Sequence, residues 1–426
     1  MKKRISLLFL AFLGLGLASE TKAQEIKIDA QIRPRAEFGN GVKGLQAKDV
    51  EGVFGVSQRT RLNFNFTNEN LKIGISLQDV RMWGDTKTAV KGDGAKTSIA
   101  QAWAEYAFND KFAFKIGRQA LSYDDQRVLG GLDWAQQGRW HDALLFKYKA
   151  EGFQMHLGGA YNDTSDPMFN DYKDLHMAWF SKDLGDLNLT ALLLNVGKKT
   201  DDPTNPANEP STKYMQTFGL NGKYAVGDLK LAASAYLQTG EIMRGNNVHD
   251  VSANQFALRA DYKVSDVFGL HGGFEHLSGM DSNKGGAESD DFKSFTPIFG
   301  TNHKFNGFMD YFYVGNHVGS VGLQDIYFGP TFKVNEKLST KLTYHYFASS
   351  ADLYNTENVK QDAGLGSEVD LTFAYTLSKD IKIVGGYSQM FASDSMEVLK
   401  GGDADETQNW AWLMININPT IFYSKK

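Results

Sequence analysis

The side chains with the most distinctive chemistry in this sequence are its arginines, which gather in the first third of the chain. Ten arginines follow residue 23, and eight of them precede residue 140. Arg33 and Arg35 are two residues apart, as are Arg59 and Arg61, and this spacing places both members of a pair on one face of a β-strand. A guanidinium group stays charged and forms paired hydrogen bonds with a carboxylate. The two pairs therefore predict a cationic strip that can bind anions.

The residues around these pairs alternate between apolar and polar, which is the pattern of a β-strand with one dry and one wet face. Leu62 and Phe64 alternate with Arg61 and Asn63, and residues 26–33 follow the same pattern. Strands of about ten residues are long enough to cross a bilayer at a tilt. Comparable runs recur at residues 229–237, 254–262, 341–347, 368–377 and 409–418.

The connections between these runs alternate between short and long, as in an up-and-down outer-membrane barrel with short periplasmic turns and long extracellular loops. We predict an all-β fold, a single antiparallel transmembrane β-barrel of about 18 strands with both termini on the periplasmic side. The short turns fall at residues 68–70, 109–110, 151–152, 185–186, 227–228, 265–266, 335–337 and 379–380. The long loops fall at residues 39–52, 83–96, 121–138, 162–172, 198–211, 240–249, 280–323, 350–366 and 392–406.

Two soluble all-β architectures compete with the barrel. A β-sandwich also alternates, because each of its strands has one core face, and a propeller shows an internal repeat of about 40–50 residues. The sequence contains neither such a repeat nor a linker that divides it. Aromatic residues near the ends of the predicted strands favour the barrel, because they predict girdles at the two membrane interfaces. These residues include Trp83, Trp103, Trp140, Tyr224 and Tyr262.

The start of the chain and its charge predict export to the bacterial outer membrane. Three cations at residues 2–4 precede an apolar run at residues 5–17, and Ala23 ends a plausible cleavage site, so we predict a signal peptide over residues 1–23 and a barrel domain over residues 24–426. A membrane anchor is the alternative, but the run is shorter than the roughly 20 residues that span a bilayer. Cleavage removes four cations and one acid and lowers the formal net charge from −5 to −8. An acidic chain excludes nucleic acid as a partner, and a chain without cysteine excludes a disulfide framework.

In both arginine-bearing strands the opposite face is apolar, so we expect the guanidinium groups to face the lumen. An arginine on the lipid face near the midplane costs about 2–4 kcal/mol. Like charges this close require an offset, which carboxylates at Asp29, Glu37 and Glu105 or an anionic solute could supply. Two interpretations stay open, an anion pathway and a network of arginines and carboxylates that braces the wall.

Several motifs carry a resemblance to a known family. Residues 117–127 begin Gly-Arg-Gln and continue to Tyr-Asp-Asp-Gln-Arg, residues 138–142 read Gly-Arg-Trp-His-Asp, and residues 58–61 read Gln-Arg-Thr-Arg. With these motifs and residues 78–85, the chain resembles the alginate-export family of outer-membrane porins. The resemblance is strongest over residues 26–150 and continues more weakly into residues 295–310.

The resemblance implies a monomeric 18-stranded barrel whose arginine-lined constriction passes a polyuronate. Two features depart from it. Strict alternation from Ile116 places Arg118 on the outer face, and the second half of the chain has only Arg244 and Arg259, too few for a full cationic ring. Carried to this chain, the lumenal arginines implied are Arg33, Arg35, Arg59, Arg61, Arg81, Arg118 and Arg139.

The loop at residues 280–323 is far longer than a hairpin requires, and such loops are often functional. Its second part is rich in glycine and aromatic residues, including Phe305 and Phe308, and Asp310 lies beside them. We predict that it folds into the lumen as a constriction or gate. A solvated external loop is the alternative.

These patterns predict an anion-selective porin for a hydrophilic solute, such as an anionic polysaccharide or a smaller organic anion. The alternative is a binding or adhesion barrel with a plugged lumen and ligand-binding loops. We expect no enzyme, because the sequence lacks a Gly-x-Ser-x-Gly elbow and a complete P-loop; a barrel hydrolase would need a Ser–His pair at the rim. We expect no cofactor, with loop-bound Ca²⁺ at Asp124-Asp125 or residues 403–406 as a weak alternative. The expected partners are outer-membrane lipid and the barrel-assembly machinery, for which Phe422 and Tyr423 are the nearest terminal aromatics.

Overall fold

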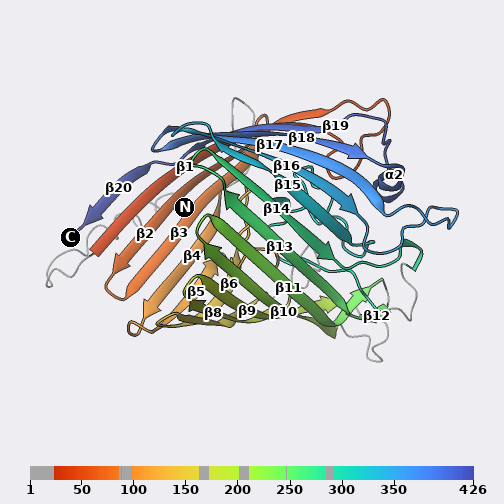
Figure 1. The fold of residues 1–426 in the computed structure, drawn as a ribbon. Helices are drawn as coiled ribbons and strands as arrows, with labels where there is room; N and C mark the ends of the chain where they lie inside the picture. Colours follow the sequence, from red (N-terminus) through yellow and green to blue (C-terminus); the bar gives the residue numbers. More distant parts are fainter. Residues whose placement is uncertain are drawn as a thin grey trace.

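The computed structural model describes residues 24–85, 88, 97–162, 172–200, 211–245, 247–284 and 291–426. Its strands form one antiparallel sheet that closes on itself (Figure 1). The predicted signal peptide lies outside the described residues. The strands are β1 (Gln24–Asn40), β2 (Val53–Asn68), β3 (Leu71–Met82), β4 (Thr97–Ala107), β5 (Phe112–Gln119), β6 (His141–Ala150), β7 (Phe153–Tyr161), β8 (Asp174–Leu184), β9 (Leu187–Thr200), β10 (Ser211–Val226), β11 (Leu229–Arg244), β12 (Asn247–Asp250), β13 (Ala253–Lys263), β14 (Phe268–Leu277), β15 (Leu323–Lys333), β16 (Leu338–Ala348), β17 (Gly364–Ser378), β18 (Ile381–Ala392), β19 (Gln408–Ile417) and β20 (Thr420–Lys425).

The barrel closes where the first strand meets the last. β1 pairs along its whole length with β2, and its other edge pairs with β19 near Asn40 and with β20 near Gln24. β20 continues β19 along the same edge, and β12 pairs with the far end of β11. The barrel therefore has 18 strands, as predicted. The prediction of a plain loop at residues 240–249 was wrong, because β11 and β12 extend there as a hairpin.

The alternation read from the sequence separates a wet inner face from an apolar outer face. Arg33 and Arg59 are 4% and 1% exposed, whereas Leu258 and Leu413 are 61% and 46% exposed. Tyr224 and Tyr262 lie on the outer face near strand ends, as expected of an interfacial girdle. Trp103 and Trp140 do not belong to that girdle. Trp103 lies 3.7 Å from the Lys115 ammonium group and Trp140 lies 5.2 Å from the Arg61 guanidinium group, both inside the barrel.

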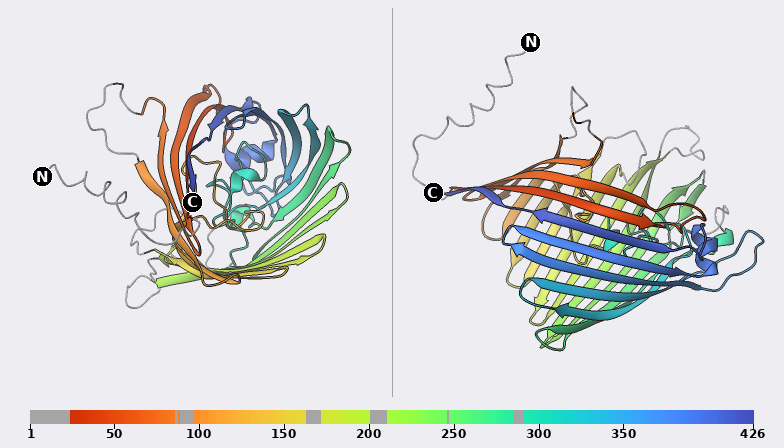
Figure 2. Two further views of the ribbon diagram at one scale, coloured as in Figure 1. Left: turned by 90° about the vertical axis from the view of Figure 1, so that its left-hand side faces the viewer. Right: turned by 90° about the horizontal axis from the view of Figure 1, so that it is seen from above.

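The tight turns gather at one end of the barrel, and Gln24, the first described residue, lies there beside the C-terminal Lys426 (Figure 2). Gly185 and Gly227 have φ of 74° and 55°, a left-handed conformation that two-residue hairpin turns require and that glycine adopts without strain. At the opposite end the loops are long. One of them, between β18 and β19, contains the short helix α2 (Asp394–Lys400), and the loop between β14 and β15 contains the 3₁₀ turns η1 (Ser282–Lys284) and η2 (Asn302–Lys304).

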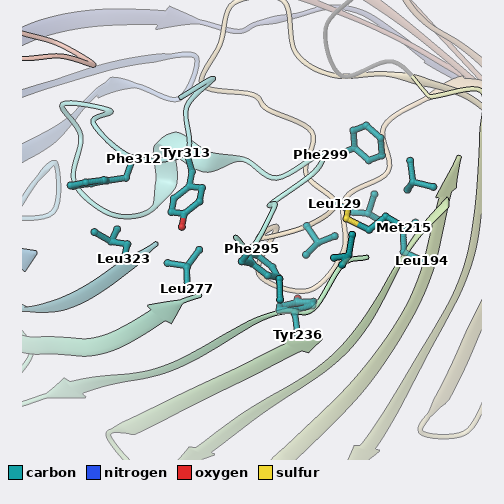
Figure 3. Close-up of a cluster of buried hydrophobic side chains, with 14 of the residues drawn as sticks. Leu129, Leu194, Met215, Tyr236, Leu277, Phe295, Phe299, Phe312, Tyr313 and Leu323 are labelled. Carbon is teal, nitrogen blue, oxygen red and sulfur yellow. The ribbon is translucent and has the colours of Figure 1, made fainter. Parts of the chain in front are cut away.

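Two of the long loops fold into the barrel and fill the middle of its lumen (Figure 2, left). They are the 120–140 loop, between β5 and β6, and the 291–322 segment, which precedes β15. Phe295, Phe299 and Tyr313 of the 291–322 segment are nearly fully buried against Tyr236 of β11 and Leu194 of β9 (Figure 3). The prediction that this segment folds inward is confirmed, and the alternative of a solvated external loop is wrong.

The two inner loops are joined to each other by backbone contacts. Leu129 forms a β-bridge with Phe299, and the Gly130 N–H donates to the Phe299 carbonyl at 2.8 Å. The Thr301 N–H donates to the Gln126 carbonyl at 2.9 Å. The two loops therefore form one plug across the lumen. Within the described residues, no helix is long and apolar enough to cross a membrane.

Placing a cation on the outer face tests the assignment of the two faces. Leu258→Arg should lower the free energy of unfolding in lipid vesicles by about 2–4 kcal/mol, because the guanidinium group would enter hydrocarbon. Thr372→Arg is the matched control, since Thr372 faces the lumen, and it should change the unfolding free energy much less. Equal losses in denaturant titrations of the two variants would contradict the assignment.

Candidate functional site

Four of the predicted arginines form a compact cluster on the inner face of β1 and β2. The strand register places Arg33 directly opposite Arg59 and Arg35 opposite Ser57, and residues paired in this way have side chains on the same face. Arg33, Arg35, Arg59 and Arg61 are all buried. The sequence alternation thus brings four guanidinium groups to one patch of the wall, which we call the arginine cluster.

The 120–140 loop supplies the main counterion of the arginine cluster. The Asp133 carboxylate lies between two strands, with one oxygen 2.9 Å from Arg59 Nη1 and the other 3.4 Å from Arg33 Nη1. Burial opposes the ionised form of Asp133, but the guanidinium groups of Arg59 and Arg33 outweigh it and lower the pKa of this carboxyl below its usual value. Asp133 therefore stays charged across the neutral range and ties the loop to the wall.

Neutral acceptors from the same loop complete the contact. Arg35 Nη1 donates to the Trp134 carbonyl at 2.8 Å, and Arg33 Nε donates to Gln136 Oε1 at 3.0 Å. Gln136 Nε2 in turn donates to Ser57 Oγ at 3.0 Å. Residues 133–136, which we call the bridging segment, thus offer carboxylate, carbonyl and amide oxygens to the arginine cluster.

Arg61 and Arg139 extend the positive surface along the loop. Arg61 Nε donates to Gln78 Oε1 at 3.1 Å, and Gln78 Nε2 donates to the Gln137 carbonyl at 3.0 Å. Arg139 is not on a strand. It donates to the Gly300 carbonyl at 2.9 Å, and burial lowers its pKa to about 10. Arg139 therefore remains a cation within the plug, and its role in the solute pathway stays a prediction.

Two arginines that the resemblance assigned to the lumen do not join the cluster. The register pairs Arg81 with Gln58, a residue that alternates with Arg59, so Arg81 belongs to the outer face at the end of β3, where it borders the mouth of the barrel. Arg118 also lies on the outer face, 3.2 Å from the carboxylate of Asp142. The lumenal placement of Arg118 was wrong because period-2 alternation along β5 turns it outward. Arg81 lines the cavity at the mouth of the barrel, so its place in a solute pathway stays a prediction.

The arginine cluster keeps an excess of positive charge. Glu37 accepts from Arg35 Nε at 2.8 Å, as the sequence suggested. The other two carboxylates proposed as offsets serve different cations, because Asp29 lies 2.9 Å from Lys27 Nζ and Glu105 lies 2.6 Å from Lys147 Nζ. Among the described residues, four guanidinium groups thus face two carboxylates, Glu37 and Asp133. The cluster therefore carries two more positive charges than negative ones.

A second charged wall, which the sequence reading missed, consists of acids on β14, β15 and β17. Glu275, Asp325, Glu368 and Asp370 are at most 4% exposed. Their partners are donors: His345 Nδ1 lies 2.9 Å from Asp325, and Ser388 Oγ donates to Asp370 at 2.5 Å. The sequence contained the pattern that predicts this wall, because these acids alternate with apolar residues such as Ile326 and Leu371 just as the arginines do. We call these four residues the acidic wall.

The acidic wall binds the plug by accepting hydrogen bonds from donor groups of the plug. The Met309 N–H donates to Glu368 Oε1 at 2.9 Å, and Asn306 Nδ2 donates to Glu275 at 2.8 Å. Arg127, from the 120–140 loop, is fully buried and forms an ion pair with Glu275. Arg127 was not among the predicted site residues, since a loop has no periodicity that assigns a face.

The three residues predicted for the gate all lie in the plug. Phe305 stacks on Arg127, with the guanidinium carbon 3.6 Å from the ring centre. Phe308 packs on His303 with ring centres 5.4 Å apart, and His303 Nδ1 lies 2.6 Å from Asp310. These contacts join residues of the plug to one another, so the three predicted residues stabilise the plug itself.

The plug divides the lumen into two cavities. The one toward the long loops has a volume of about 910 Å³ and is lined by Arg35, Arg139, Phe308 and Trp410 among others. The one toward the turns has a volume of about 730 Å³ and is lined by β13–β19, including Trp412 and Lys341. Trp134 is the only residue that lines both among the described residues. The two cavities therefore meet at the bridging segment.

The acidic loop residues considered for Ca²⁺ have other contacts. Asp124 accepts from Trp179 Nε1 at 2.9 Å and from Thr190 Oγ1 at 2.6 Å, and Asp403 accepts from the Asp405 N–H at 2.9 Å. In the parts of the chain that the structure describes, no three His, Asp or Glu side chains are grouped so that they could hold a metal ion.

A family of known proteins shares this combination of barrel and motifs. The model of the family described as alginate export matches residues 25–409, most of the chain. The protein belongs to the alginate export family. It is therefore an outer-membrane β-barrel of a porin family, and its family supports a role in transport.

Solved structures show the same fold at low sequence identity. Acinetobacter baumannii OccAB4 has a TM-score of 0.63 at 10% identity, covering 95% of this chain and 99% of that chain. OccAB1 of the same organism has a TM-score of 0.63 at 13% identity, covering 94% and 97%. Pseudomonas aeruginosa OpdK, in a structure with vanillate, has a TM-score of 0.58 at 12% identity, covering 92% and 98%. No curated protein matches the sequence.

Removing the cation from the Arg127–Glu275 pair tests whether the acidic wall anchors the plug. Arg127→Met should destabilise the barrel by about 3–5 kcal/mol, because it leaves Glu275 buried without a counterion. The double variant Arg127→Met/Glu275→Gln should regain most of that loss. Arg259→Met is the control, since its ion pair with Asp261 is half exposed and contributes about 0–1 kcal/mol. Denaturant titration measures all three, and a double variant as unstable as Arg127→Met would contradict the anchoring role.

Proposed function

We propose that the protein is an anion-preferring outer-membrane channel for hydrophilic carboxylate solutes, which pass from one lumenal cavity to the other along the arginine cluster. The observation that carries this proposal is the excess of positive charge at the point where the two cavities meet. A carboxylate binds a guanidinium group through paired hydrogen bonds, and positive charge at a pore constriction favours anions. Polyuronates such as alginate and smaller organic acids share this chemistry.

The surroundings of the arginine cluster support a path for such solutes. Lys43, Lys198 and Lys213 line the outer cavity together with Arg139, and Lys263 and Lys341 line the inner one. Aromatic and apolar side chains lie between these cations, among them Trp410 in the outer cavity and Trp412 in the inner one. A sugar ring or an aromatic acid presents both a carboxylate and an apolar face, so both fit this lining. The vanillate in the OpdK structure makes aromatic carboxylates a second set of test solutes.

The expected setting of the channel follows from its outer face. The apolar band on the outer face would contact outer-membrane lipid. The barrel-assembly machinery would insert the barrel, with Phe422 and Tyr423 as its terminal aromatic residues. We propose that the channel works as a monomer, because one barrel contains both cavities and the whole arginine cluster.

The filled lumen favours one alternative, a binding or adhesion barrel that does not conduct. In that case the outer cavity would hold a ligand, and the plug would stay in place. Purified protein in planar bilayers separates the two functions, because a binding barrel would retain a carboxylate ligand yet show no conductance.

Neutralising two arginines tests the channel proposal. Arg59→Gln/Arg61→Gln should lower the anion-to-cation permeability ratio severalfold, measured as the reversal potential across a KCl gradient, since it removes two of the four positive charges of the arginine cluster. The effect should shrink at high salt because ions screen the field. Arg118→Gln, on the outer face, is the matched control and should leave the ratio unchanged. A cation preference in the wild type, or a ratio insensitive to the double substitution, would contradict the proposal.

A further inference from the structure

The bridging segment occupies the arginine cluster in the way a carboxylate solute would. Its acceptors include the Asp133 carboxylate, the Trp134 carbonyl and the Gln136 amide oxygen. We propose that residues 133–136 are a built-in ligand of the arginine cluster and that Trp134 is the gate residue between the two cavities, opened when a carboxylate solute takes the place of Asp133. This inference rests on the proposed channel function and adds the step that controls it.

The position of Trp134 supports a gate at this point. Its ring lies 4.2 Å from the guanidinium carbon of Arg35 and stacks on His303, with ring centres 4.4 Å apart and an interplanar angle of 16°. Trp410 and Trp412, from β19, present their edges to it at 5.8 Å and 4.8 Å. The indole is thus wedged between the arginine cluster, the 291–322 segment and the wall. A solute that passes from Trp410 to Trp412 must pass it.

The bonds of the bridging segment to the arginine cluster are of the kind that a solute can replace. Arg33, Arg35 and Arg59 donate to oxygen atoms of the segment, and a solute carboxylate offers the same acceptors with a full negative charge. The Asp133 side chain is 75% exposed to the lumen although both its oxygens contact arginines. A solute can therefore approach Asp133 from the water-filled side and exchange with it.

The ends of the bridging segment are held, so that its middle can move without unfolding the plug. On one side the Leu132 N–H donates to Thr301 Oγ1 at 3.2 Å, and on the other the Arg139 N–H donates to the Gly131 carbonyl at 2.9 Å. Leu132 and Gly138, which flank the segment, have φ of 50° and 70°. A left-handed leucine is strained, and such positions are found where a loop changes conformation. These two residues are the expected hinges.

Shortening the gate residue tests the inference first. Trp134→Ala should raise single-channel conductance in planar bilayers severalfold and keep the anion preference, because the arginine cluster is intact. Trp83→Ala is the matched control, since Trp83 is 61% exposed at the end of β3, and its conductance should equal that of the wild type. Sodium glucuronate should raise the opening rate of the wild type, glucose should not, and neither should affect Trp134→Ala.

A cross-link tests the gate without relying on a truncated side chain. The chain has no cysteine, so Ser57→Cys/Gln136→Cys carries the only two thiols, at positions whose native side chains are hydrogen-bonded at 3.0 Å. A short bis-methanethiosulfonate should abolish the glucuronate-induced openings, and a reductant should restore them. Ser57→Cys alone, treated in the same way, is the control.

The outcomes separate this inference from the channel function on which it rests. An anion-preferring conductance that neither Trp134→Ala nor the cross-link changes overturns the gate and leaves the channel. Absence of conductance in both the wild type and Trp134→Ala overturns the channel and the gate with it. Conductance that rises in Trp134→Ala and stops on cross-linking supports both.

Discussion

A guanidinium group on the lipid face near the middle of the bilayer costs about 2–4 kcal/mol, and this constraint determines how the rest of the lumen is built. On β1 and β2 the arginines must point inward, where the register brings Arg33 against Arg59. Four like charges in so small a space need acceptors, and the strands themselves provide one carboxylate, Glu37, and the amide oxygens of Gln31 and Gln78. The 120–140 loop provides the others by folding into the barrel. The arginine cluster thus holds the loop inside the barrel, next to the path that we propose for anions.

The plug lies between two walls of opposite charge. The arginine cluster binds oxygen acceptors of the bridging segment, whereas the acidic wall binds donors, namely Arg127, Asn306 and the Met309 N–H. Contacts to the acidic wall are fully buried, whereas at the arginine cluster the Asp133 side chain is 75% exposed and Trp134 lines both cavities. Buried ionic contacts are hard to break one partner at a time, while solvent-accessible ones exchange. The side of the plug at the acidic wall is therefore the fixed one, and we propose that the side at the arginine cluster is the one that moves.

The period-2 alternation of the strands made much of this fold predictable. The loops have no such periodicity, and their contacts were not predictable from the sequence. Alternation assigned the four clustered arginines, and the regular change of short and long connections gave the strand number. Arg118 was misplaced, because the resemblance implied a lumenal position while the alternation of its own strand turns it outward. The acidic wall follows the same rule as the arginines and was predictable in principle. Trp134, Gln136 and Arg127 lie in a loop without a repeating pattern, and their roles depend on contacts with residues about 100 or more positions away, which local rules do not give.

The most direct test of the account is the accessibility of two neighbouring residues on β2. Because the chain has no cysteine, Arg61→Cys and Leu62→Cys each introduce a single thiol into protein reconstituted in vesicles. A charged, membrane-impermeant methanethiosulfonate should modify Arg61→Cys and alter its conductance, whereas Leu62→Cys should react only with a lipid-soluble maleimide. The reverse pattern, with position 61 accessible only from lipid and position 62 from water, would contradict the inward arginine cluster and everything inferred from it.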